Sequence, residues 1–182
     1  MTGIDSKLLI PDSQFHYDPA VNSIDFLKRY DSYLWGLTIE GVLIPALIDA
    51  ISAAYDWPQR WAWITLQAEQ SLVERLDTPP QKALDWAMGY GIEADYDASG
   101  NLTGPPNVKD IYRGILNQII HGIPTARSYF REWNPATTQK VQGQIITTPS
   151  AYSWMALQYT PAFERLAINF DLWNKYGGKL TT

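Results

Sequence analysis

The chain has no cysteine among its 182 residues, and it has only two histidines, His16 and His121. The absence of cysteine excludes disulfide bonds, thiol nucleophiles and cysteine-based metal sites. Two histidines do not suffice for a histidine-rich zinc site, and no stretch has the pattern of a calcium-binding EF-hand loop. We therefore expect neither a metal nor a cofactor.

Clustered positive charge and long apolar runs are also missing. The 14 Lys and Arg residues are scattered and the formal net charge is -5, whereas nucleic-acid binding requires clustered basic side chains. No run approaches the roughly 18 apolar residues of a membrane span, and residues 1–12 lack the apolar stretch and cleavage site of a signal peptide. We expect a protein that binds no nucleic acid and does not span a membrane.

Aromatic residues, in contrast, are abundant. There are 8 Trp, 11 Tyr and 5 Phe, or 13% of the chain, more than one core of this size needs. Most are expected to pack in the core, and some to line a binding groove, because flat apolar faces with a polar group suit sugar rings. The length and the 46% hydrophobic content predict a single domain over residues 1–182.

Helical signals dominate the pattern along the chain. A lead-in over residues 1–21 is expected to be extended, 89–107 to form a loop or a small hairpin, and 134–149 an irregular connection or one edge strand. The fold class is therefore predicted to be mainly α. The predicted helices cover residues 24–34, 40–55, 58–76, 84–89, 107–133, 150–159 and 161–176.

Particular residues mark the ends of these helices. Asn22 or Ser23 is expected to cap the first helix, Asp56 the helix over 58–76, and Asn107 the long helical region. A bend or break is expected near Pro124, because proline cannot donate the backbone hydrogen bond inside a helix.

One carboxylate stands out within the predicted helix 58–76. Glu69 shares a stripe with apolar residues, because the spacings between them alternate between four and three residues. A carboxylate in such a row is partly desolvated, which raises its pKa toward the range of a proton donor at neutral pH. On position alone, a structural glutamate is the alternative interpretation. The stripe consists of Ala62, Leu66, Glu69, Val73 and Leu76.

Four short segments carry a family resemblance in a fixed order: LQAEQSLV at 66–73, AMGYG at 87–91, GILNQI at 114–119, and QYTP at 158–161 followed by Asn169 and Trp173. The first resembles the catalytic-helix segment of bacterial cell-wall hydrolases of the lysozyme-like superfamily, and the set is similar to peptidoglycan lytic transglycosylases and goose-type lysozymes. The resemblance implies a lysozyme-like helical domain.

The resemblance also implies residue roles. Glu69 would be the general acid near the end of its helix, and residues 89–91 would shape the turn beside it. Ser71, Tyr90, Gln118 and Tyr159 would bind the substrate along a groove, although tertiary packing is an alternative role for Gln118 and Tyr159. The implied substrate is peptidoglycan or another N-acetylhexosamine polymer, cleaved at the β-1,4 MurNAc–GlcNAc bond. The expected place of action is the bacterial periplasm, the cell wall or the exterior, with phage-type release as a variant, and the protein is expected to be monomeric.

Two reaction types remain open. Hydrolysis with two carboxylates requires a second Asp or Glu across the scissile bond, and Glu93, Asp95 and Asp97 are the candidates. Otherwise Glu69 acts alone, first as acid and then as base, as in lytic transglycosylases. The alternative from another class is a non-catalytic carbohydrate-binding protein of the cell wall, or a phage or secretion-associated structural protein with the same fold.

Overall fold

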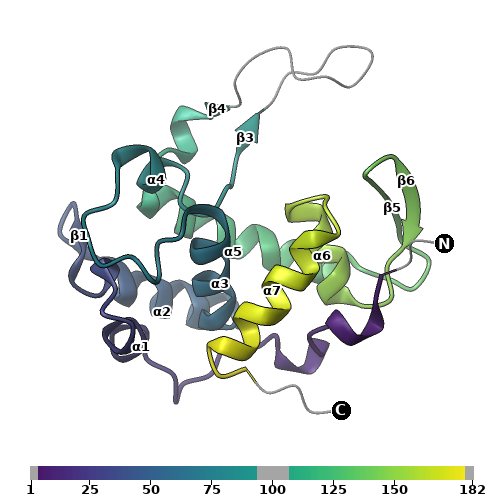
Figure 1. Ribbon diagram of the computed structural model, residues 1–182, viewed down its shortest axis with the longest axis horizontal. Coiled ribbons are helices and arrows are strands. Elements are labelled where there is room, and N and C mark those ends of the chain that lie inside the picture. The colour runs from purple at the N-terminus through teal and green to yellow at the C-terminus, as the bar shows by residue number, and fades with distance from the viewer. Residues whose placement is uncertain (1–3, 94–106, 179–182) are drawn as a thin grey trace.

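The computed structural model describes residues 4–93 and 107–178, and most of its elements are helices (Figure 1). This confirms a mainly helical fold class. The α-helices are α1 (Ser23–Arg29), α2 (Ile44–Tyr55), α3 (Gln59–Gln70), α4 (Gln81–Asp85), α5 (Ile115–Glu132), α6 (Ala151–Tyr159) and α7 (Glu164–Lys175), and the short 3-10 helices are η1 (Ser6–Leu8), η2 (Asp12–Gln14), η3 (Tyr33–Gly36) and η4 (Asp110–Tyr112).

Three small antiparallel hairpins accompany the helices. They pair β1 (Thr38–Ile39) with β2 (Val42–Leu43), β3 (Ile92–Glu93) with β4 (Asn107–Val108), and β5 (Thr138–Val141) with β6 (Gln144–Thr147). The second and third project from the helical body at different places (Figure 1). The hairpin expected within 89–107 is thus present, whereas the segment 134–149 contains two paired strands in place of one edge strand.

Helix α3 is shorter at its C-terminal end than the sequence pattern predicts. Ser71 adopts the left-handed conformation with φ of 53°, which ends a helix. The side-chain oxygen of Gln67 then accepts hydrogen bonds from the backbone N–H groups of Val73 and Glu74, at 3.0 and 3.1 Å. Glu69 consequently lies in the last turn of α3. Val73 and Leu76, the last two residues of the predicted stripe, are not helical, and Leu76 is exposed.

Two of the predicted helix caps are wrong. Asp56 is the left-handed residue that ends α2, and its carboxylate accepts a hydrogen bond from the backbone of Tyr17 at 3.1 Å. Asn107 lies in strand β4, and α5 begins later, after Gly114. Pro124 lies inside α5, which continues to Glu132. Asn22, in contrast, caps α1 as predicted, accepting from the backbone N–H of Asp25.

The N-terminal lead-in is part of the core, and it is not simply extended. The ring of Phe15 is 4% exposed and lies 5.2 to 5.4 Å from the rings of Trp57, Phe130, Tyr152 and Trp173. The carboxylate of Asp12 accepts hydrogen bonds from the first two N–H groups of α6, at 3.1 and 2.9 Å. These contacts hold α6, and with it Tyr159 at its C-terminal end, against the body of helices.

Candidate functional site

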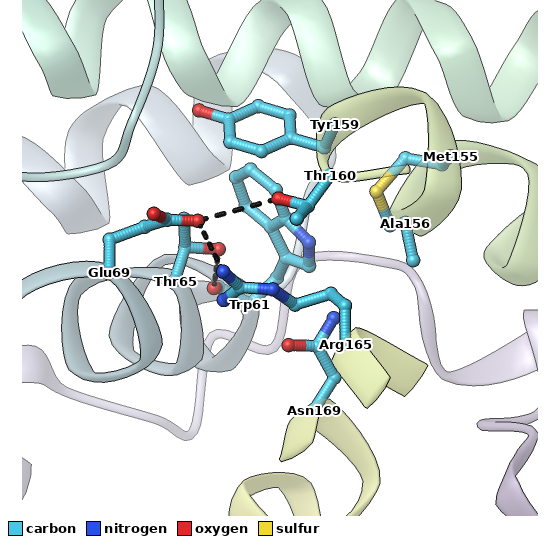
Figure 2. A pocket seen from close by; sticks show the side chains of 9 residues that line it. All are labelled: Trp61, Thr65, Glu69, Met155, Ala156, Tyr159, Thr160, Arg165 and Asn169. Carbon is cyan, nitrogen blue, oxygen red and sulfur yellow. Dashed lines mark hydrogen bonds and ion pairs between the residues drawn. The ribbon is translucent and has the colours of Figure 1, made fainter. Parts of the chain in front are cut away.

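Glu69 lies where α3 meets the C-terminal end of α6 and the start of α7. Its side chain is only 17% exposed, and Figure 2 shows its carboxyl group directed toward side chains from both of the other segments. The pocket has about 10 Å³ of free space, which is room for about one water molecule. Its lining consists of Trp61, Thr65, Glu69, Met155, Ala156, Tyr159, Thr160, Arg165 and Asn169.

The two oxygens of the Glu69 carboxyl group have different surroundings. Oε1 is paired with Nη2 of Arg165 at 2.8 Å and accepts a weak hydrogen bond from the hydroxyl of Thr160 at 3.5 Å. Oε2 points away from both (Figure 2) and lies against Gly89. Among the residues that the structure describes, no hydrogen bond or ion pair is formed by Oε2.

Gly89 allows this close approach. A Cβ atom at position 89 would lie 2.9 Å from both Cδ and Oε2 of Glu69 and 3.3 Å from Oε1, and the φ angle of +69° disfavours any side chain there. The turn at residues 89–91 thus lies against the carboxyl group.

The pKa of Glu69 is raised above its ordinary value. Burial is the largest cause, and Arg165 and the hydroxyl of Thr160 act in the opposite direction without cancelling it. The position of Glu69 in the last turn of α3 acts in the same direction as burial, because the C-terminal end of a helix carries partial negative charge. A proton is therefore retained on this carboxyl group to higher pH than on an exposed glutamate.

A larger cavity of about 330 Å³ lies next to this pocket. Gly89 and Tyr159 belong to its lining, so it adjoins Glu69 across the same turn. Its wall is rich in tyrosine, with an amide and a cation in addition. The lining consists of Gly89, Tyr90, Gly91, Ile92, Lys109, Tyr112, Thr125, Tyr129, Gln158 and Tyr159.

Tyr159 lines both cavities and has an unsatisfied hydroxyl group. Its ring packs edge-on against Trp61, with centroids 5.4 Å apart, while its oxygen is buried without a hydrogen-bond partner. Burial raises the pKa of Tyr159 far above its ordinary value, and the nearby Glu69 adds to this. The group is thus a neutral donor. A buried hydroxyl without a partner is costly, so a ligand or water that accepts from it gains affinity.

Tyr90 also lines the larger cavity. Its ring lies edge-on to Tyr112 at 4.8 Å and parallel to His121 at 6.2 Å. Tyr112 in turn contacts His121 at 5.1 Å. Tyr90, Tyr112 and Tyr129 line the cavity. Neither Tyr112 nor Tyr129 was singled out by sequence, because nothing local distinguishes a tyrosine that lines a cavity from a core tyrosine.

Gln118 does not face the groove. It is completely buried, and its side-chain oxygen accepts from the N–H groups of Met88 and Tyr90, at 3.1 and 2.9 Å. Its side-chain nitrogen donates to the carbonyl groups of Tyr90 and Tyr112, at 2.8 and 2.7 Å. An amide side chain has two donors and two acceptor sites, so all four are used. Gln118 therefore fixes the turn beside Glu69.

Two further predicted residues, Ser71 and Glu93, do not line the Glu69 pocket. Ser71 lines a separate open depression together with Glu74 and Leu76. Glu93 is exposed on β3 and paired with Lys109 at 2.6 Å. Asp95 and Asp97 lie outside the described residues.

The sequence analysis did not identify Arg165, which lies at the start of α7 and forms the ion pair with Glu69.

Over residues 4–93 and 107–178, there is no group of three or more His, Asp or Glu side chains that could hold a metal ion. Within the same residues, none of the helices combines the length and the apolar character needed to cross a membrane. Comparison with protein-family models, with curated proteins and with solved structures gave no match to this chain.

Proposed function

We propose that this protein cleaves the glycan strand of peptidoglycan, or of a related N-acetylhexosamine polymer, with Glu69 as its acid. The observation that carries the proposal is the environment of Glu69: a mostly buried carboxyl group with a raised pKa, lying against Gly89 at the edge of a tyrosine-lined cavity. Glycosidic bond cleavage requires such a group, because the leaving oxygen must receive a proton as its bond to the anomeric carbon breaks.

The geometry favours Oε2 as the oxygen that carries this proton. The side of Oε1 is occupied by Arg165 and Thr160, and the free space there holds only about one water molecule. Oε2 makes neither contact and is the carboxyl oxygen nearer to Gly89, which lines the larger cavity. A sugar bound in that cavity would approach the carboxyl group across the glycine turn.

The second half of the reaction is proposed to use the same carboxyl group. Among the described residues, Glu69 is the only carboxylate that lines either cavity, and the exposed Glu93 is already paired with Lys109. In the single-acid route, the ionised Glu69 removes the proton from the muramoyl 6-hydroxyl group. That oxygen then bonds to the anomeric carbon, giving a 1,6-anhydro product and restoring the protonated acid.

The larger cavity suits an uncharged sugar with polar substituents. The faces of Tyr90 and its neighbours can stack on a pyranose ring, the amide of Gln158 can both donate and accept, and the hydroxyl of Tyr159 is a donor without a partner. The acetamido carbonyl of an N-acetylhexosamine is an acceptor that would satisfy it. Action at the bacterial cell wall is part of this proposal.

A second candidate is a non-catalytic carbohydrate-binding protein, and the ion pair favours it. Arg165 at 2.8 Å stabilises the ionised form of Glu69, which opposes proton donation. In that case the cavity would hold a glycan without cleaving it.

The test is digestion of purified peptidoglycan sacculi, with the products identified by mass spectrometry. We expect Glu69→Gln to lower the rate of cleavage by about 1,000-fold or more, because the amide cannot donate the proton. Glu74→Gln is the matched control, since it removes the same charge from a carboxylate paired with Lys175 and Tyr176 outside both cavities.

The products separate the alternatives. Anhydro-muramoyl ends support the single-acid route, while reducing ends indicate hydrolysis by water. Glycan binding without cleavage by the unaltered protein would favour the carbohydrate-binding candidate, and full activity of Glu69→Gln would exclude Glu69 as the acid.

A further inference from the structure

Glu69 and Arg165 each lie at the unfavourable end of a helix. The glutamate is in the last turn of α3 and the arginine in the first turn of α7, whereas helices favour acidic groups at the N-terminal end and basic groups at the C-terminal end. Helices α3 and α7 pack against each other, and this brings the two misplaced charges to 2.8 Å. Neither charge is accounted for by the stability of its own helix.

The ion pair is also asymmetric. Arg165 contacts Oε1 through Nη2, and its side chain is only 14% exposed, so it is held within the pocket. Figure 2 shows the guanidinium group and the Thr160 hydroxyl on the same oxygen, with Oε2 turned away from both. An arginine that served only to neutralise the carboxylate would be free to engage both oxygens, as bidentate pairs do.

We propose that Arg165 is the positioning residue of this site: it holds Oε1 of Glu69 in place and thereby leaves Oε2, on the side of Gly89, to carry and receive the proton. The inference rests on the proposed function, and it adds a residue outside all the segments on which the family resemblance depends. Arg165 itself is not among the residues that line the larger cavity.

The same contact serves both halves of the single-acid route. While the carboxyl group is protonated at Oε2, Oε1 remains an acceptor for the guanidinium group. After the proton has moved to the leaving oxygen, Arg165 stabilises the carboxylate and keeps Oε2 in position to act as the base. Burial and the partial negative charge at the C-terminal end of α3 limit this stabilisation. The carboxylate of Glu69 therefore takes up a proton again. The groups that face Glu69 are Arg165 from α7, Thr160 from the connection before it, the neutral Tyr159 from α6, and Gly89.

The experiment follows Glu69 directly, by the pH dependence of its ¹³C carboxyl resonance, assigned from its absence in Glu69→Gln. The variants are Arg165→Gln, which removes the cation, and Arg165→Lys, which retains the charge without the planar guanidinium fork. Arg29→Gln, at an exposed position of α1, is the matched control. Cleavage of sacculi is measured over the same pH range.

We expect the Glu69 resonance to titrate at higher pH in Arg165→Gln, near the wild-type pH in Arg165→Lys, and unchanged in Arg29→Gln. The alkaline limb of the pH–rate profile should move upward in Arg165→Gln, because the carboxyl group stays protonated to higher pH. The maximal rate should fall by about 100-fold, as misplaced catalytic groups do, with KM changed by less than about threefold. Arg165→Lys should recover part of the rate.

An unchanged titration of Glu69 in Arg165→Gln would overturn the inference, and so would wild-type rates in both variants. Circular dichroism shows whether Arg165→Gln folds. If it does not, Arg165→Lys decides: a folded protein with the wild-type rate overturns the inference. A folded Arg165→Lys protein with a lowered rate and a wild-type titration of Glu69 supports the inference. A wild-type protein that cleaves no glycan overturns the proposed function instead, while the titration still decides whether Arg165 governs Glu69.

Discussion

Gln118 and Glu69 both contact the segment around Gly89, but they differ in how many of their polar atoms form hydrogen bonds. Gln118 uses all four of its hydrogen-bonding positions on backbone groups of Met88, Tyr90 and Tyr112. Glu69 uses one oxygen and leaves the other beside Gly89. A buried polar group with every bond made stabilises the fold, whereas one left incomplete costs stability and is available to a ligand. The comparison separates the residue that builds the site from the residue proposed to act in it.

The largest change in stability is expected from Gln118→Leu. The substitution removes the hydrogen-bond partner of two N–H groups, of Met88 and Tyr90, and of two C=O groups, of Tyr90 and Tyr112. The free energy of unfolding should therefore fall by about 3 kcal/mol or more. Urea denaturation measures this, with the exposed Gln81→Leu as control, expected to change it by less than about 0.5 kcal/mol. A stable Gln118→Leu protein that has lost glycan binding would instead assign Gln118 to the substrate.

Tyr159→Phe should lower turnover by about tenfold, the equivalent of one hydrogen bond to the substrate. Its thermal midpoint should stay unchanged or rise, because the hydroxyl has no partner in the protein and the ring still packs on Trp61. Turnover of sacculi and thermal denaturation are measured on the same preparation. Lower stability with unchanged turnover would show that the hydroxyl serves packing.

Glu69→Gln should leave the free energy of unfolding at neutral pH unchanged or raise it by about 1 kcal/mol or less. Because burial raises the pKa of Glu69 in the folded state, the stability that this group contributes is present below its unfolded pKa. It is lost as pH rises through the folded pKa. The free energy of unfolding of Glu69→Gln, measured by urea denaturation, should therefore increase relative to that of the wild type as pH rises. The opposite trend would mean that the Arg165 ion pair outweighs burial.

The smallest effect is expected from Glu93→Gln. The residue is exposed and its ion pair with Lys109 lies at the surface, where solvent screens such pairs and they contribute little to stability. Turnover of sacculi should change by less than about twofold. A loss comparable to that of Glu69→Gln would identify Glu93 as the second carboxylate and replace the single-acid route with two-carboxylate hydrolysis.

The sequence allowed the helical class and the desolvation of Glu69 to be predicted, because both depend on local spacing of apolar residues, and Ala62 and Leu66 of the stripe do precede Glu69 in α3. It did not allow the end of α3 to be placed. Ser71 ends the helix in a left-handed conformation that glycine usually adopts, and the side chain of Gln67 caps the turn. Neither residue type marks a helix end by itself.

Contacts between distant segments explain the other differences. Arg165 could not be paired with Glu69 from sequence, since the packing of α3 on α7 creates the pair. Its only local signal is a cation in the first turn of a helix, which is unfavourable there. Gln118 was expected at the groove because the family resemblance implied it, with tertiary packing as the alternative. That choice depends on which way the side chain points, and only the tertiary structure fixes this.

The bond from Asp12 to the start of α6 has a consequence for how the chain folds during synthesis. Its partners are 139 and 140 residues apart in sequence, so the N-terminal segment leaves the ribosome long before the helix it caps exists. Closing so long a loop is a late step. Until then Phe15 has neither Tyr152 nor Trp173 to pack on, and an apolar segment near the N-terminus stays exposed to other chains or to chaperones.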